Sequence, residues 1–242
     1  MLPSDINSID IDTVEHKLVI GGGQGISHNE PSQDFAIRLI DLETRMPVTQ
    51  PLAGHTGYLH AVQFCEKSRI IASAGEDGTA RTWDPRLGKK ACNTAILEPY
   101  KDPNLTRPKL GNWLGDVSIH GDWLITGGGA RPALWHLRSL AAVIVPELPE
   151  NCQDVHVAQI IKADPDRVVI GGQFFSGKMF HYSMTNGDLM AEVNTSSTCL
   201  YNVAAVDKSD FKMLSACGAS NKIDLCTHNF SYADNCVEFP LL

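Results

Sequence analysis

The chain has 242 residues, 43% of them hydrophobic, which is enough for a buried core in one large or two small domains. A formal net charge of −8 argues against non-specific nucleic-acid binding as its main task, because phosphates would be repelled. No apolar run is long enough to span a membrane, and the N-terminus carries an early acidic residue and lacks the apolar segment of a signal peptide.

The seven cysteines are scattered along the chain, and no two of them have C-x-x-C spacing. Neither a disulfide framework nor a zinc site is therefore predicted. The tightest group of potential metal ligands is Cys217, Cys226, His228 and Cys236, whose outer spacings fit no zinc motif. We interpret the cysteines as reduced, buried thiols of an intracellular protein and expect no metal.

A unit of strand-forming residues recurs five times, and the units are expected at about residues 5–52, 53–97, 113–146, 153–192 and 200–241. One position, in the third strand of each unit, is occupied in turn by Ile40, Trp83, Trp135, His181 and Cys226. Successive positions are separated by 43, 52, 46 and 45 residues, a spacing typical of a four-stranded repeat. No linker marks a second domain.

The first repeat contains an insertion at residues 23–34 whose role the sequence does not reveal. Together with Gly21 and Gly22, its glycines resemble a loop that cradles phosphate. However, no lysine follows and no helix begins, both of which such a loop needs. Glycine runs recur at 127–129 and 171–172 in the equivalent place, which favours a turn between strands.

The second repeat carries the most specific motif. Gly54-His55 is followed by an acidic turn at residues 75–78, and the next strand ends in Trp83-Asp84. This succession resembles one blade of a WD40 propeller. We therefore predict an all-β fold, a WD40-type β-propeller of which five four-stranded blades of a presumed seven are visible.

The resemblance implies a buried network in this blade. In such blades the tryptophan, a hydroxyl, the histidine and the turn aspartate bond in series, and the matching residues are Trp83, Ser73, His55 and Asp77. A serine, a histidine and an aspartate also suggest a hydrolase triad. Ser73 lies in mid-strand without a G-x-S-x-G motif, so we interpret the tetrad as structural and expect neither catalysis nor a cofactor.

The remaining repeats have weaker motifs. The third keeps Trp135 but has neither the Gly-His pair nor the turn aspartate, so its tetrad is expected to be lost. The fourth and fifth retain only the strand pattern and turns, among them a hairpin turn at residues 186–188.

The segment from Arg81 to Lys109 is locally basic, with seven basic and three acidic residues. Tyr100-Lys101 and Arg107-Pro108-Lys109 are residues of the kinds that stack on RNA bases and contact phosphates. A solvated loop is the alternative interpretation, and we favour it.

Further motifs resemble one WD40 family, the sixth subunit of the THO complex. They lie at 41–44, 54–56, 58, 60, 75–78, 81, 83–84, 86, 107–108, 111, 113, 115 and 122–123. The most specific is Gly127-Gly-Gly129 followed by residues 134–139, in which Trp135-His136 replaces Trp-Asp. After about residue 145 the resemblance is one of pattern and length.

This resemblance implies a seven-bladed, non-enzymatic scaffold in the nucleus that supports mRNA processing and mRNA export. Its partners would be the protein subunits of the THO complex, with RNA reached indirectly and with no membrane or small-molecule substrate. Partner contacts are expected at the rims, where we nominate Tyr58, His60, Glu76, Arg86 and Arg138.

Other functions remain open. Residues 83–86, Trp-Asp-Pro-Arg, resemble the Trp-Asp-x-Arg box of substrate receptors of cullin-4 ubiquitin ligases. Direct RNA binding is a further alternative. Compared with the family, the chain begins where the third blade would begin. We therefore expect an open arc or strained ring, the product of a short isoform or incomplete gene model, that is poorly soluble when expressed alone.

Overall fold

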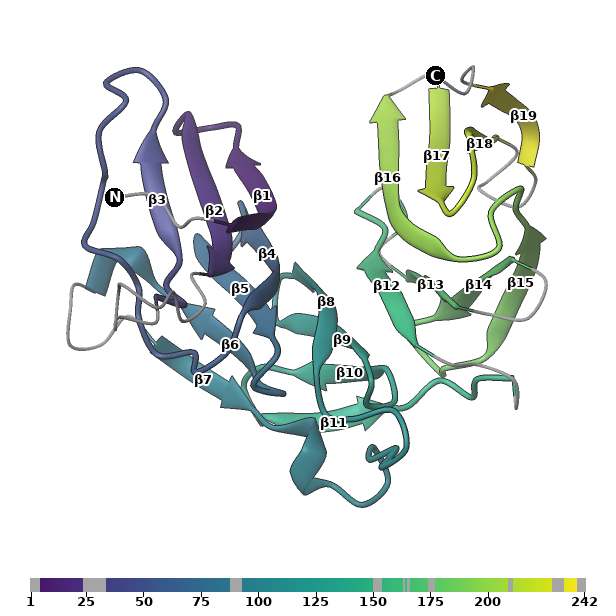
Figure 1. The fold of residues 1–242 in the computed structure, drawn as a ribbon, viewed down its shortest axis with the longest axis horizontal. Coiled ribbons are helices and arrows are strands. Elements are labelled where there is room, and N and C mark those ends of the chain that lie inside the picture. The colour runs from purple at the N-terminus through teal and green to yellow at the C-terminus, as the bar shows by residue number, and fades with distance from the viewer. Residues whose placement is uncertain are drawn as a thin grey trace, which may run out of the picture.

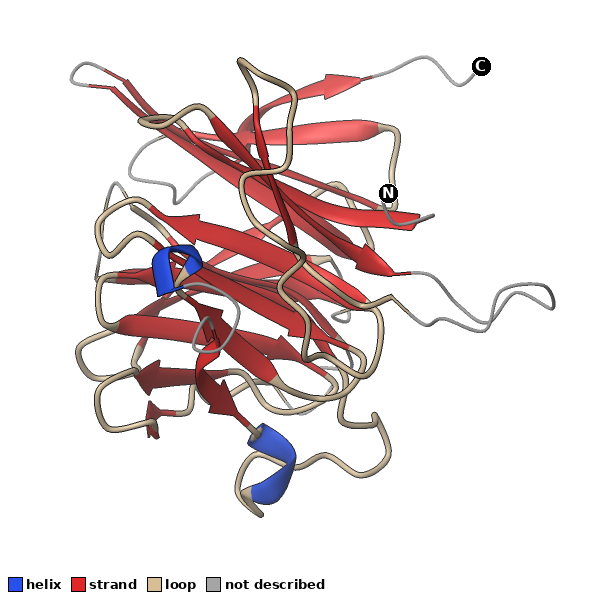
Figure 2. Cartoon of the chain, turned by 90° about the vertical axis from the view of Figure 1, so that its left-hand side faces the viewer, coloured by secondary structure: helices blue, strands red, loops and turns tan. Residues whose placement is uncertain are grey.

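The computed structural model describes residues 5–23, 34–87, 93–149, 154–162, 164, 166–173, 177–208, 211–227 and 233–238. Within these ranges the chain forms five antiparallel sheets and two short 3-10 turns, Pro85–Leu87 and Pro99–Lys101. Each sheet is built from strands that are consecutive in the sequence. Strands and the loops between them make up nearly all of the described chain (Figure 2). The prediction of an all-β, WD40-type propeller is confirmed.

The sheets follow one another along the chain, and we refer to them as blades 1 to 5. Their strands are β1 (Asp5–Asp12), β2 (Lys17–Gly23) and β3 (Arg38–Asp41); β4 (Leu59–Cys65), β5 (Ile70–Gly75), β6 (Ala80–Trp83) and β7 (Asn93–Leu97); β8 (Leu114–His120), β9 (Trp123–Gly128), β10 (Ala133–His136) and β11 (Ala141–Ile144); β12 (Val155–Ile160), β13 (Arg167–Gly172), β14 (Lys178–Ser183) and β15 (Leu189–Asn194); β16 (Leu200–Lys208), β17 (Phe211–Gly218), β18 (Lys222–Cys226) and β19 (Ala233–Glu238).

Blade 1 has three strands, so the prediction of four-stranded blades is wrong for this sheet. Where a fourth strand would lie, the described chain forms two isolated bridges, Ile37 with Leu52 and Ile40 with Pro47. Val48 donates its N–H to Leu39, but Pro47 has no N–H to continue the ladder. The outer edge of this blade therefore remains irregular.

The five blades are arranged as an arc, with blade 1 and blade 5 at its ends (Figure 1). The first strand of each blade is the innermost, and β1, β4, β8, β12 and β16 lie side by side in this order. They line the inner side of the arc, which we call the channel and which contains a cavity of about 230 Å³. Residues on all five inner strands line this cavity.

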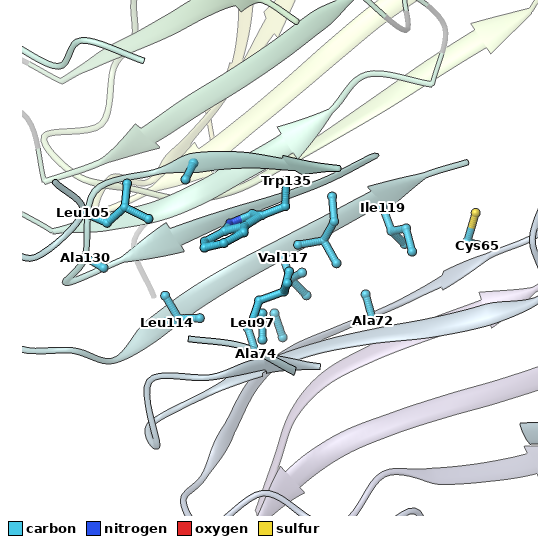
Figure 3. Packing of buried hydrophobic residues seen from close by; sticks show 14 residues of the cluster. Cys65, Ala72, Ala74, Leu97, Leu105, Leu114, Val117, Ile119, Ala130 and Trp135 are labelled. Atoms are coloured by element: carbon cyan, nitrogen blue, oxygen red, sulfur yellow. The ribbon is translucent and has the colours of Figure 1, made fainter. Parts of the chain in front are cut away.

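The hydrophobic core lies between neighbouring blades. Each of the four interfaces contains its own cluster of buried residues. Trp83 is fully buried between blades 1 and 2, whereas Trp135 fills the interface between blades 2 and 3 together with Leu97 and Ile119 (Figure 3). Because every cluster joins two blades, each blade depends on its neighbours for burial.

Candidate functional site

All five inner strands carry an irregularity of register at the same end. The shifts lie between Ile6 and Ser8, Leu59 and Ala61, Leu114 and Asp116, Val155 and Val157, and Leu200 and Asn202. The extra residues are therefore Asn7, His60, Gly115, His156 and Tyr201. A β-bulge re-aims a side chain, and here it does so at one mouth of the channel, which we call the channel mouth.

The glycines that recur in the sequence make this geometry possible. They lie at the end of the second strand of each blade: Gly22, Gly75, Gly128, Gly172 and Gly218. A Cβ atom at each would lie only 1.8 to 2.6 Å from the carbonyl oxygen of the residue two positions before the bulge. Glycine is required here because of this close approach of two backbones. The sequence predicts these glycines as turn residues, whereas the structure shows that they are needed because two backbones approach closely.

Four rings form a row along the channel mouth. Trp113 occupies the space beside Gly115, where a Cβ would lie 2.6 Å from its ring. Its ring centroid lies 6.2 Å from that of His60 and 5.7 Å from that of His156, with which it is stacked. The ring of Tyr201 follows at 5.5 Å from His156. These rings line an open cavity of about 660 Å³ together with Glu76.

The five nominated contact residues fall on the two faces of the propeller. His60 donates from Nε2 to Glu76 Oε2 at 2.6 Å at the channel mouth, and Tyr58 lies beside Phe35 with ring centroids 5.4 Å apart. Arg86 and Arg138 follow the third strands of blades 2 and 3 and therefore lie on the opposite face of the propeller. The structure thus brings His60 and Glu76 together and separates them from the two arginines.

Both arginines are exposed and paired with a carboxylate. Arg86 donates from Nε and Nη2 to the two oxygens of Asp84, at 2.8 and 2.7 Å, and its side chain is 61% exposed. This partner lowers the pKa of the Asp84 carboxyl. Arg138 pairs with Asp122 at 2.8 Å. The Arg138 pair is exposed on both sides and adds little stability, so Arg138 is available to a partner at small cost. Asp84 is buried, so Arg86 is held more firmly by its carboxylate.

The predicted tetrad forms a continuous series of hydrogen bonds. Trp83 Nε1 donates to Ser73 Oγ at 2.8 Å, and the Ser73 hydroxyl bonds His55 Nε2 at 2.8 Å. His55 Nδ1 then donates to Asp77 Oδ2 at 2.9 Å. The Ser73 side chain is completely buried, so no substrate reaches its hydroxyl in this structure.

Burial and hydrogen bonds keep His55 and Asp77 of the tetrad in one protonation state each. Burial lowers the pKa of His55, against the opposing effect of the Asp77 carboxylate, so the imidazole is neutral at pH 7. Burial would raise the pKa of Asp77, but hydrogen bonds from His55, Thr56 and Thr79 outweigh it and hold this pKa far below its usual value. A neutral imidazole between a hydroxyl and a carboxylate satisfies all three groups.

Blades 3 and 4 contain other pairs of polar side chains on their second and third strands, where blade 2 has Ser73 and Trp83. In blade 3, Trp135 Nε1 donates to Thr126 Oγ1 at 3.0 Å. In blade 4, His181 is completely buried and its Nδ1 lies 3.2 Å from Arg167 Nη1. Burial and the nearby guanidinium lower the pKa of His181 to about 4. Arg167 is not among the residues predicted from the sequence, although an arginine that opens an otherwise apolar strand is a signal of a buried polar partner.

Side chains of the inner strands also tie neighbouring blades together. Asp10 accepts a hydrogen bond from the N–H of Phe64 at 2.7 Å. Asp116 accepts from the N–H of Ala158 at 2.8 Å and from Gln159 Nε2. Burial raises the pKa of Asp116 to about 7, against the lowering effect of these donors. Every such bond spans two blades and so stabilises the arc.

The basic segment between Arg81 and Lys109 uses much of its charge internally. Lys101 pairs with Glu98 at 2.7 Å, and Arg81 lies 3.8 Å from Asp77. Arg107 donates to three backbone carbonyls of residues 128–130. These contacts favour the loop interpretation over RNA binding, although Arg107 is bonded to the protein backbone and is not simply solvated as expected. Lys89 and Lys90 lie outside the described residues.

No group of three potential ligands among the described residues is arranged to hold a metal ion. Of the group considered above, Cys226 is buried and Cys217 is exposed. His228 and the side chain of Cys236 lie outside the described part of the chain, as does most of the insertion at residues 23–34. No helix within the described ranges has the length and apolar character needed to cross a membrane.

The comparisons with known proteins agree with this geometry. Residues 46–84, which include the whole tetrad, match the WD40 family model, described as WD domain, G-beta repeat. The chain forms a β-propeller, and the segment that includes most of blade 2 is a WD40 repeat. The match stops within blade 2, where the motifs are most complete.

The resemblance to THO complex subunit 6 is also confirmed. The chain is 33% identical to THO complex subunit 6 of Drosophila melanogaster over 97% of its length, which covers 59% of that relative. It is 30% identical to the Danio rerio homolog over 94% of its length, covering 64% of it, and 31% identical to the Homo sapiens protein over 93%, covering 60%. The chain thus spans about three-fifths of these relatives.

Proposed function

We propose that this propeller is a non-enzymatic scaffold subunit of the nuclear THO complex and supports mRNA processing and mRNA export. The single observation that carries this proposal is the similarity to THO complex subunit 6 over nearly the whole chain. Its partners would be other protein subunits of that complex, with RNA contacted through them. The role needs no cofactor and no small-molecule substrate.

The positions of the candidate residues favour a role as a protein scaffold over a role as an enzyme. Ser73 and His55, the residues with the types needed for nucleophilic catalysis, are buried and bonded to each other. In contrast, aromatic and acidic groups are exposed at the channel mouth, and two guanidinium groups are exposed on the opposite face. Tyrosine and arginine are frequent hot spots of protein interfaces. Tyr58, His60, Glu76, Arg86 and Arg138 therefore remain our proposed contact residues.

Co-purification tests the proposal. An affinity-tagged chain is expected to recover THO subunits from nuclear extract, as identified by mass spectrometry, and Tyr58→Ala or Arg86→Ala is expected to reduce this recovery. Lys178→Ala is the matched control, because Lys178 forms an equally simple pair with Glu192 on the outer half of blade 4. Recovery that is unchanged in both variants would refute the nominated contacts, and absence of THO subunits would refute the proposal itself.

The alternative function is substrate recognition for a cullin-4 ubiquitin ligase. The observation in its favour is that the Trp83–Arg86 box presents its arginine at the surface, held by Asp84. The same experiment separates the two functions, because recovery of a cullin-4 adaptor without THO subunits would select the alternative. RNA bound directly by the purified chain would instead indicate an RNA-binding protein.

A further inference from the structure

We propose that the channel mouth binds the cationic side chain of an arginine-containing peptide segment, held by the rings of Trp113, His156 and Tyr201 and by the carboxylate of Glu76. This inference rests on the proposed scaffold role, since it names a ligand for one of its surfaces. It goes further than the THO proposal in that it specifies the chemistry recognised at one surface.

The geometry provides a receptor for a flat cation. The bulges of β12 and β16 direct His156 and Tyr201 into the mouth, and Trp113 enters from the segment before β8. Three ring centroids follow one another at 5.7 and 5.5 Å, and Tyr201 is 58% exposed. The stacked rings of Trp113 and His156 and the tilted, exposed ring of Tyr201 form an aromatic wall of the kind on which a guanidinium stacks.

The acidic residues that line the channel favour binding of a cation over binding of an anion. Glu76 lines the mouth, and its side chain is 57% exposed, so its carboxylate is accessible beyond its bond to His60. Deeper in the channel the wall includes Asp10. Among the described residues that line the two cavities there is neither a lysine nor an arginine. A guanidinium is therefore attracted, whereas the phosphates of a nucleic acid are repelled.

His156 does not oppose this selection. Burial lowers the pKa of His156, so its ring is neutral at pH 7 and offers an aromatic surface rather than a competing charge. His60 directs its Nε2 toward Glu76 and thereby positions that carboxylate beside Trp113. The four rings and one acid thus act as a single preformed pocket.

The test is a binding titration with the full 242-residue chain. The probe is a fluorescein-labelled peptide of glycine and serine residues around one arginine, followed by fluorescence anisotropy. The matched peptide has citrulline in place of arginine, which keeps the shape and removes the charge. We expect the citrulline peptide to bind about tenfold more weakly, in line with the loss of a cation–π contact and a charge-assisted hydrogen bond.

Variants locate the binding site. Tyr201→Ala and Glu76→Gln are each expected to weaken binding about fivefold, the size of effect of one cation–π or charged contact. Both side chains are largely exposed, so both variants should fold, which circular dichroism verifies. Glu192→Gln, an exposed carboxylate on β15 in a simple ion pair, is the control and should bind like the unaltered chain.

Several results would overturn the inference: equal binding of the arginine and citrulline peptides, no binding of either, or affinities that Tyr201→Ala and Glu76→Gln leave unchanged. Binding of a labelled oligouridine in preference to the peptide would likewise refute it and indicate stacking of RNA bases. Because these measurements use peptides alone, their failure leaves the co-purification test of the THO proposal unaffected, and the reverse also holds.

Discussion

The tetrad of blade 2 allows a quantitative test, which is the replacement Ser73→Ala. The Ser73 hydroxyl accepts from Trp83 at 2.8 Å and bonds His55 at 2.8 Å, and all three side chains are buried. The substitution removes both bonds and adds no atom that could replace them. We expect the free energy of unfolding to fall by roughly 1–3 kcal/mol, because two buried polar groups lose their partner.

Urea denaturation followed by tryptophan fluorescence measures this change. Ser215→Ala is the matched control, because Ser215 donates a single bond to Ala204 at an exposed position and should have a near-zero effect. Thr126→Ala should give an intermediate loss, since only Trp135 loses a partner there. A Ser73→Ala variant as stable as the unaltered chain would refute the reasoning. A hydrolytic activity that this variant abolishes would show that the tetrad is catalytic.

Three further predictions address other parts of the chain. His181 stays neutral in the folded state down to a pKa of about 4, whereas the unfolded chain protonates it near 6.5, so stability is lost as the pH falls through this window. Relative to His181→Gln, the loss should be roughly 3 kcal/mol in urea titrations, and a pH profile parallel to that of the variant would contradict this. Gly128→Ala, whose Cβ would lie 2.3 Å from the Trp113 carbonyl, should cost about 1–3 kcal/mol or more in thermal unfolding; an unchanged midpoint would contradict the close approach. Arg138→Ala should change stability by less than about 0.5 kcal/mol, because its ion pair is exposed; a larger loss in the same assay would assign it a structural role.

Several features follow from local sequence. Strand order and the five repeats are predictable because alternation and strand-end glycines recur at nearly constant spacing. The tetrad partners His55, Ser73, Asp77 and Trp83 are identifiable because the motif of one blade supplies all four. These signals are local and lie within one repeat, so each can be interpreted without knowing how the blades pack.

Tertiary structure decides the rest. A bulge that directs Tyr201 or His156 into the channel mouth leaves no pattern in its own strand, because one extra residue in a strand is defined only by its partner strand. The row of rings exists because separate blades converge on one channel, and Trp113 joins it only because Gly115 leaves space. The irregular edge of blade 1 likewise depends on whether residues near Pro47 find a partner. Sequence by itself thus determines what each blade contains, whereas contacts between blades determine which side chains meet.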